Sequence, residues 1–397
     1  STYVAYTATP FANIFIDPAS EHEMYGADLF PKDFIVGLEA PDNYFGSEKV
    51  FGENFSVTRE INDNEDFLPL KHKNHHELLA LPGSLEIAVQ TFVLCRAIRI
   101  LRGDTTAHSS MLVNASRFTS VQGELRNSIH TFVENIKRHI RYCAAKPEAE
   151  ALKDEELANL NRVWLEEYSS LEFNWIDIQE VLLEAAAPIK VVEVNSKSSG
   201  QLNYSDYPES GLHVISVGGF SLSRGLTLEG LSISYFLRNS MMYDTLLQMG
   251  RWFGYRPGYE DLCRVWMSPA AEGWYEHISE SIEELRDEIR KMEKLNLTPK
   301  DFGLKVRSHP DTLIVTARNK MGSSEKIKVR IGLSNRLIET TSLSKKKPDI
   351  TANINATKYF LTAIGVGDFD PKMPRGNYFW HGVSPDKITD YLNTFIN

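Results

Sequence analysis

The sequence predicts an α/β protein built on a parallel sheet, and three observations lead to this fold class. Short apolar segments alternate with helical segments from about residue 109 to 268, which is typical of parallel sheets. The 397 residues are enough for two or three domains at about 100–200 residues each. Apolar residues make up 42% and charged residues 24% of the chain, which is ordinary globular composition.

The first 83 residues predict little regular structure. Residues 1–16 predict an apolar strand, a tight turn and a second apolar stretch, because Pro10 restricts Thr9 to extended geometry. Residues 20–83 are rich in Asp, Asn, Gly and Pro, and we expect them to be irregular. Ser84 is a favoured N-cap residue and Gly103 a favoured helix stop, so a helix is predicted between them.

Five apolar strands and two helices are predicted in the part that follows. The strands are expected at 111–113, 189–194, 214–217, 233–237 and 263–267, and the helices at about 125–142 and 242–253. An acidic helical stretch at about 143–187 interrupts the alternation, and its simplest interpretation is a surface insertion. A long amphipathic helix is predicted after Pro269.

These segments divide the chain into three predicted parts. Residues 1–83 form the end of one domain and a linker, and residues 84–268 form the sheet domain with its helical insertion. Residues 269–397 form a C-terminal α+β accessory domain, which begins with the long helix and continues with basic strands.

The formal net charge of −10 conceals a strong segregation of charge. Residues 148–184 hold eleven acids and two bases, whereas residues 304–347 hold eleven bases and three acids. The segment Lys326-Ile327-Lys328-Val329-Arg330 alternates charged and apolar residues, which predicts a strand with one basic face. Such a face could follow a phosphate backbone, although a solvated surface is the commoner meaning of a charge run.

Cysteine usage and hydropathy exclude several classes of protein. The three cysteines are far apart and form no CxxC pair, which excludes a cysteine-based zinc site and a disulfide scaffold. No apolar run reaches the roughly 18–20 residues that a membrane helix needs. The opening residues carry no basic leader. We therefore expect a cytoplasmic protein without a membrane segment.

The most informative pattern for function is Gln248-Met249-Gly250-Arg251-Trp252-Phe253-Gly254-Tyr255-Arg256, at the end of a predicted helix. A guanidinium group is permanently charged and binds phosphate with a fork of donors. Against a transferring phosphoryl group it stabilises the transition state as an arginine finger. A surface ion pair is the alternative for each arginine.

Two further segments accompany this pattern, and together the three resemble the later motifs of superfamily 2 helicases and translocases. Thr7-Ala8-Thr9 is similar to motif III, which implies that Thr7 and Thr9 couple two RecA-like domains. The pattern around Arg251 is similar to motif VI, which implies catalytic roles for Gln248, Arg251 and Arg256. Four residues separate these two arginines, where the superfamily usually has two.

The resemblance also implies a nucleic-acid interface. Met111 to Arg117 would be motif IV, on the first strand of a second RecA-like domain, so that Ser116 and Arg117 contact the nucleic-acid backbone. The segment Ser223-Arg224-Gly225 resembles motif V, which implies the same role for all three residues. Thr227 stands where the superfamily often has an acid, so the role of that acid does not transfer.

More narrowly, the motif around Arg251 and the segment Leu81-Pro82-Gly83-Ser84-Leu85 are similar to the Z-one domain family. These bacterial proteins are classed as candidate endonucleases and are found fused to a helicase core in restriction-like systems. The resemblance extends to about residue 270. It implies that residues 84–268 are a second RecA-like domain of a nucleic-acid-dependent ATPase in bacterial restriction or defence. The implied partners are DNA and further nuclease or ATPase subunits.

The sequence contains no GxxxxGK[ST] motif, which phosphate binding by a P-loop requires. Because the segment similar to motif III lies at residue 7, the resemblance implies that motifs I and II lie upstream of Ser1. ATP and Mg²⁺ are therefore expected as cofactors only in the full-length protein, and no ATP hydrolysis by residues 1–397 alone. Asp154-Glu155-Glu156 lies in the acidic stretch, and we interpret it as solvated surface.

Two further groups of residues, one of histidines and one of acids, resemble metal-binding sites. His72, His75 and His76 have spacings that could hold a metal, but the flanking lysines favour an exposed linker, and we expect no metal site. Asp349 and Asp370 imitate the acids of a metal-dependent nuclease, although Pro371 would damage the strand that such a site needs. A metal-dependent endonuclease is thus one alternative function. A non-catalytic module, whose acidic insertion docks a partner, is another.

Overall fold

The computed structural model describes most of the chain in several continuous ranges. These are residues 33–51, 57–195, 202–219, 226–238, 243–302, 347–370 and 377–395, together with residues 4, 6, 7, 14, 31 and 222. The chain divides into two compact units, Ser1–Ser324 and Glu325–Asn397. The predicted turn at Thr9 and the predicted basic strands at 305–330 lie outside the described residues.

The first unit contains a six-stranded sheet in which every neighbouring pair is parallel. In spatial order the strands are β2 (Thr58–Glu60), β8 (Arg264–Met267), β6 (Leu231–Phe236), β3 (Ser109–Asn114), β5 (His213–Gly218) and β4 (Lys190–Val194). The predicted α/β class and parallel sheet are therefore confirmed. The central strand β3 is buried along its whole length between β5 and β6, as expected for a parallel sheet covered on both faces.

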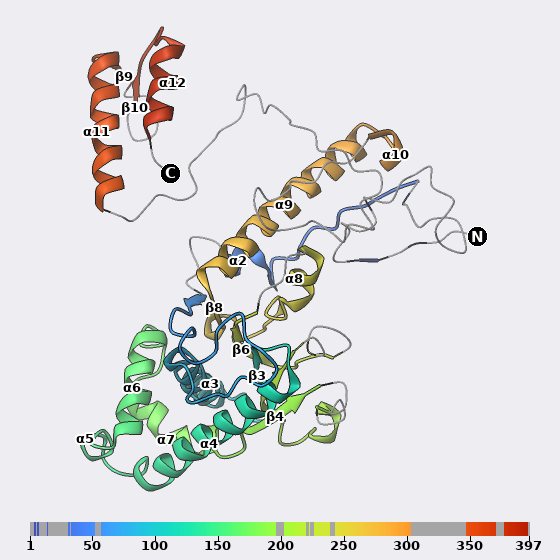
Figure 1. Ribbon diagram of the computed structural model, residues 1–397, viewed down its shortest axis with the longest axis vertical. Coiled ribbons are helices and arrows are strands. Elements are labelled where there is room, and N and C mark those ends of the chain that lie inside the picture. Colours follow the sequence, from blue (N-terminus) through green and yellow to red (C-terminus); the bar gives the residue numbers. More distant parts are fainter. Residues whose placement is uncertain are drawn as a thin grey trace. The chain divides into compact units, whose positions relative to one another are not determined.

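One face of the sheet is covered by α3 (Gly83–Leu101) and α4 (Thr119–Cys143), as Figure 1 shows. The acidic stretch forms α5 (Glu148–Ala151), α6 (Glu155–Glu167) and α7 (Trp175–Ala186). Helices α6 and α7 pack against α3 on the side that faces away from the sheet, and α3 is consequently buried nearly all round. The acidic stretch thus contributes apolar side chains to the main core through residues such as Leu160 and Leu182.

The opposite face is covered by two parts of the chain. The connection between β5 and β6 buries Leu222 and Leu228 against Leu112 of β3 in a second apolar cluster. Beside it lie α8 (Tyr243–Met249) and α9 (Pro269–Lys294). Phe236 of β6 meets the rings of Trp252 and Tyr275 there, at centroid distances of 5.5 and 5.9 Å.

Several short elements differ from the sequence prediction. Strand β1 (Tyr44–Phe45) pairs antiparallel with β7 (Gly254–Tyr255), and α2 (Ser47–Phe51) packs on α9, so the region predicted as irregular contains regular structure. Helix α8 ends at Met249 and not at residue 253 as predicted. A Cβ on Gly250 would lie only 2.9 Å from the Phe253 ring, so the chain turns tightly where glycine permits it.

Helix α3 begins differently from the prediction. Its N-cap residue is Pro82, and Ser84 lies inside the first turn. The Ser84 hydroxyl and backbone N–H both donate to the carboxylate of Asp63, at 2.5 and 2.8 Å. An acceptor distant in the sequence therefore satisfies donors at the helix start that local capping leaves open. The predicted stop is correct, since Gly103 has a φ of 88° just after the helix.

The second unit contains a small helical pair and a short hairpin. Helices α11 (Lys347–Ile364) and α12 (Pro385–Thr394) contact each other, with Phe360 stacked on Tyr391 at 4.7 Å. Strands β9 (Asp368–Asp370) and β10 (Asn377–Phe379) pair antiparallel.

The short helix α10 (Pro299–Phe302) follows α9 in the first unit. Among the described residues, no helix combines the length and apolarity that crossing a membrane requires.

Candidate functional site

The candidate site lies at the carboxyl edge of the sheet, where the connections diverge. The chain leaving β3 enters α4, which packs beside β4 and β5 on one face. The chain leaving β5 passes over the other face, where Leu222 joins the second apolar cluster. Such a switch point opens a crevice at the carboxyl ends of neighbouring strands, where ligands of open α/β sheets bind.

Ser116 organises the turn between β3 and α4. This buried residue accepts a hydrogen bond from the backbone N–H of Phe118, at 3.1 Å to its Oγ. Its backbone carbonyl accepts one from Gln122 Nε2 at 2.9 Å. The Nε2 atom of His72 lies 2.7 Å from Ser116 Oγ, so a segment distant in the sequence is anchored on this turn. Ser116 therefore has a structural role in the turn, while Arg117 beside it is exposed.

Two glycines lie at the end of β5, close to the turn that follows β3. A Cβ on Gly218 would lie 2.4 Å from the carbonyl oxygen of Val194, and one on Gly219 would lie 2.6 Å from Gln122 Nε2. Gly218 consequently requires glycine, because the clash is with backbone, whereas a side chain at Gly219 would have to displace the Gln122 amide. The same Cβ position on Gly219 is 3.7 Å from Nη1 of Arg238, so this arginine reaches the crevice from the end of β6.

Arg238 carries an unsatisfied donor into the crevice. Its Nη1 atom is buried and has no hydrogen-bond partner among the residues that the structure describes. Burial lowers the pKa of the Arg238 guanidinium, and the positive charge of Arg117 lowers it further. A buried guanidinium donor without an acceptor is energetically costly, and the charge of Arg117 adds to the cost. An anion at this place would satisfy the donor and neutralise the repulsion.

The arginines that resemble motif VI occupy different environments. Arg251 is half-buried and donates from Nη2 to the carbonyl oxygen of Leu226, the residue directly after the segment similar to motif V. Arg256 turns back on its own segment and donates from Nη2 to the carbonyl oxygens of Arg251 and Trp252, each at 3.2 Å. Burial lowers the pKa of the Arg251 guanidinium, and the charge of Arg256 adds to this effect.

The other predicted site residues have mixed outcomes. Gln248 lies in the last turn of α8 and is half-buried, and Thr7 is exposed. Four predicted residues lie outside the described part of the chain: Thr9, Ser223, Arg224 and Gly225. Coupling by Thr7 and Thr9 and catalysis by Gln248, Arg251 and Arg256 stay predictions.

The residues weighed for metal binding are placed as follows. His72 and His76 are partly buried, and the rings lie 5.6 Å apart, so their segment is docked on the protein and is not an exposed linker throughout. Asp349 lies in the first turn of helix α11. Asp154 is the N-cap residue of α6 and also contacts His139 at 2.8 Å, which differs from a purely solvated acid. Within the described ranges, no group of three or more His, Cys, Asp or Glu residues could hold a metal ion.

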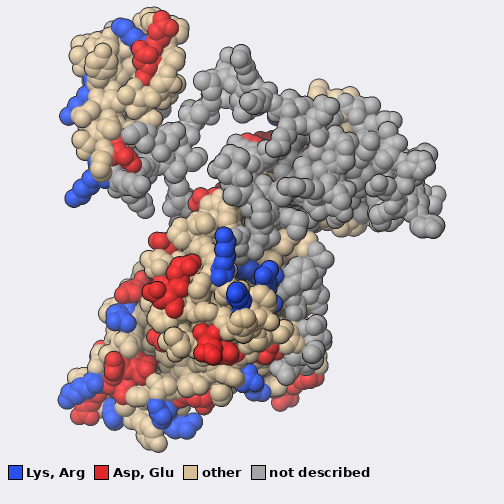
Figure 2. All heavy atoms as spheres, viewed as in Figure 1, with Lys and Arg blue, Asp and Glu red and all other residues tan. Residues whose placement is uncertain are grey.

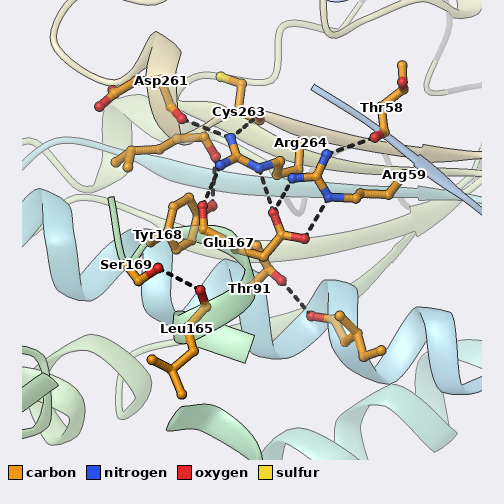
Figure 3. Close-up of polar contacts among 12 residues, drawn as sticks. Thr58, Arg59, Thr91, Leu165, Glu167, Tyr168, Ser169, Asp261, Cys263 and Arg264 are labelled. Carbon is orange, nitrogen blue, oxygen red and sulfur yellow. Dashed lines mark hydrogen bonds and ion pairs between the residues drawn. The ribbon is translucent and has the colours of Figure 1, made fainter. Parts of the chain in front are cut away.

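Sequence reasoning missed a buried ion triad beside the edge strand β2, drawn in Figure 3. The carboxylate of Glu167 lies between the guanidinium groups of Arg59 and Arg264, with Nε–O distances of 2.6 and 2.7 Å. The Glu167 side chain is only 6% exposed. The triad joins β2, α6 and β8, three elements that are distant in the sequence, so no local pattern could reveal it.

Sequence reasoning also missed Arg238 and Gln122. A usable signal existed for Arg238, because it lies one residue past the predicted strand at 233–237. The argument that placed Ser116 at the carboxyl end of a parallel strand applies to it equally. Gln122 gave no such signal, because its contact with Ser116 depends on how α4 leaves the sheet.

Comparison with protein families agrees with the motif around Arg251. The model of one family, the Z1 domain, matches residues 84–313, which is more than half of the chain. The match begins at the start of α3 and includes all strands of the sheet except β2. No curated protein and no solved structure matches the chain. The resemblance to the Z-one family is therefore confirmed, and the chain belongs to the Z1 domain family.

Proposed function

We propose that this chain is the C-terminal part of a nucleic-acid-dependent ATPase of the superfamily 2 type. The observation that carries the proposal is the environment of Arg251. This arginine is half-buried beside Arg256, and among the described residues no carboxylate forms an ion pair with either. A desolvated pair of cations without a counter-charge favours an anionic ligand such as a nucleotide phosphate.

The two arginines have separate tasks in this proposal. Arg256 holds the turn after α8 through its contacts with backbone carbonyls, and so fixes the position of Arg251. Nη2 of Arg251 already donates to the Leu226 carbonyl. The Nη1 and Nε atoms of the same guanidinium then donate to the γ-phosphate and stabilise the charge that develops on it during transfer. The described residues offer no cluster of acids for Mg²⁺, so the ion would be held by another domain.

The remaining assignments follow from the same proposal. Residues 84–268 act as the second RecA-like domain, with the acidic helices at 143–187 as its insertion. Residues 1–83 were predicted to join it to the P-loop domain and residues 269–397 to form the accessory domain. Strand β2 and helix α9, however, pack with the sheet domain in the first unit, so the linker lies before β2 and the accessory domain begins after α9. Arg117 at the carboxyl end of β3 faces the nucleic-acid backbone, while the buried Ser116 shapes the turn that carries it. DNA is the expected partner in a bacterial restriction or defence system.

Steady-state ATP hydrolysis tests the proposal. The protein encoded by the complete gene should hydrolyse ATP, and single-stranded DNA or RNA should accelerate it, whereas residues 1–397 alone should show no turnover. Hydrolysis by residues 1–397 alone would contradict the division of labour between two domains. Plasmid nicking that needs Mg²⁺ but not ATP, and that Asp370→Ala abolishes, would favour the endonuclease alternative instead.

A further inference from the structure

We propose that residues 69–77, termed here the histidine–lysine segment, form a phosphate-binding wall that extends the crevice at the end of β3. The ligand is the sugar–phosphate backbone of a single-stranded nucleic acid. This inference rests on the proposed function in that both require a nucleic-acid partner. The segment lies before the part of the chain that the Z1 domain matches, so the family assignment does not include it.

The segment is held against the turn before α4 by contacts of His72 and Asn74. His72 contacts Ser116 Oγ at 2.7 Å, and its Nδ1 lies 2.6 Å from the carbonyl oxygen of Pro69. The ring of Phe118 meets the His72 ring at 5.8 Å. Further along, the hydroxyl of Ser120 donates to the carbonyl oxygen of Asn74. The segment is therefore a fixed part of the site.

The segment lines an open pocket of about 460 Å³, and most of the lining side chains are lysines and histidines. Lys71 and Lys73 are exposed, and neither forms an ion pair with a described acid. Glu77 also lines the pocket and offsets one of these charges. With two lysines and one acid, the pocket lining keeps a positive charge, and the exposed Arg117 follows Ser116, the residue that His72 contacts.

The start of α4 adds donors at the same place. The first N–H groups of a helix have no intrahelical acceptor, and the N-cap residue Phe118 supplies no side-chain cap. Helix α4 has 25 residues, so the positive end of its dipole is well developed. Arg238, close to the same turn, has a buried Nη1 for which the described part of the chain offers no acceptor. Helix N–H groups without a side-chain cap, a buried guanidinium donor and lysines without a described ion pair together favour phosphate over a neutral ligand.

The test is binding of fluorescein-labelled dT20 and rU20 to the 397-residue chain, followed by anisotropy at several salt concentrations. The double variant Lys71→Gln/Lys73→Gln removes two exposed cations from the pocket. The control Arg138→Gln/Arg141→Gln removes two exposed cations from the far end of α4. Each phosphate contact contributes about 0.7 to the slope of log K against log salt for single strands.

We expect the pocket variant to bind both oligonucleotides about tenfold more weakly at 0.1 M salt, with a slope reduced by about 1.4. The control should stay within twofold of the wild type. Equal affinities for wild type and pocket variant, or equal losses of affinity in both double variants, would overturn this inference. The proposed ATPase function would not be affected by either result. If the wild type binds neither oligonucleotide, the inference and the nucleic-acid part of the proposed function both fail. ATP hydrolysis by the complete protein is measured separately.

Discussion

Glu167 shows how a single buried residue joins distant parts of this chain. Its carboxylate is shared between Arg59 and Arg264, and the guanidinium of Arg264 also donates to the Glu167 backbone carbonyl at 2.7 Å. The triad therefore connects the edge strand β2 to α6 and β8. Burial raises the pKa of Glu167, but hydrogen bonds and charge from the two arginines outweigh it and leave this pKa below its usual range.

Replacing Glu167 should destabilise the first unit strongly. Glu167→Gln leaves two largely buried guanidinium groups without their counter-charge, and we expect the free energy of unfolding to fall by about 3 kcal/mol. The neighbouring variant Glu166→Gln changes an exposed acid and should cost less than about 0.5 kcal/mol. Urea denaturation followed by circular dichroism measures both values. Equal costs for the two variants would show that the triad does not stabilise the fold.

The same residue predicts a pH dependence. Because the pKa of Glu167 is lower in the folded state, its stabilisation is fully present above the unfolded value of about 4.3. This stabilisation is lost as the pH falls through the lower folded value. The difference in unfolding free energy between wild type and Glu167→Gln should therefore be constant from pH 7 to 5 and shrink below about pH 4. A difference that grows on acidification would contradict the assignment.

At the scale of elements, the sequence predicted what depends on local pattern. The central strands and α9 have continuous apolar runs or a helical period, and Gly103 ends α3 as expected. Strand β2 has only three residues in a polar region, so its pairing with β8 could not be predicted. The start of α3 depends on Asp63, and the end of α8 depends on ring contacts, both of which are set by tertiary structure.

The acidic helices are the element whose role most needs testing. Leu182 of α7 is fully buried, whereas the next residue, Leu183, is 43% exposed. Leu182→Ala should cost about 3 kcal/mol because it leaves a cavity against the core, and Leu183→Ala should cost less than about 1 kcal/mol. Differential unfolding in urea gives both values. A small cost for both variants would mean that α7 is a peripheral element and does not cover α3 as part of the core.

At the scale of the whole molecule, the net charge of −10 does not describe how acidic and basic side chains are distributed over the surface. Over the region of α4 to α6, Figure 2 shows acidic and basic side chains interspersed on the same face. Around the carboxyl edge of the sheet and in the motif around Arg251, by contrast, the arginines Arg117, Arg238, Arg251 and Arg256 form no ion pair with an acid in the described part of the chain. The resemblance to helicase motifs suggested roles for Arg117 and Arg251 but none for the histidine–lysine segment, because the docking of this segment on Ser116 depends on a contact across 44 residues.

The central claim is that Arg251 acts on a nucleotide phosphate, and Arg251→Lys tests it most directly. In the complete protein, this variant should lower kcat for nucleic-acid-stimulated ATP hydrolysis by about 10³-fold, because lysine lacks the planar fork of donors. Binding of dT20 should stay within twofold, which shows that the fold is intact. The control Arg141→Lys, at the exposed end of α4, should keep the wild-type rate. An unchanged kcat in Arg251→Lys would contradict the account.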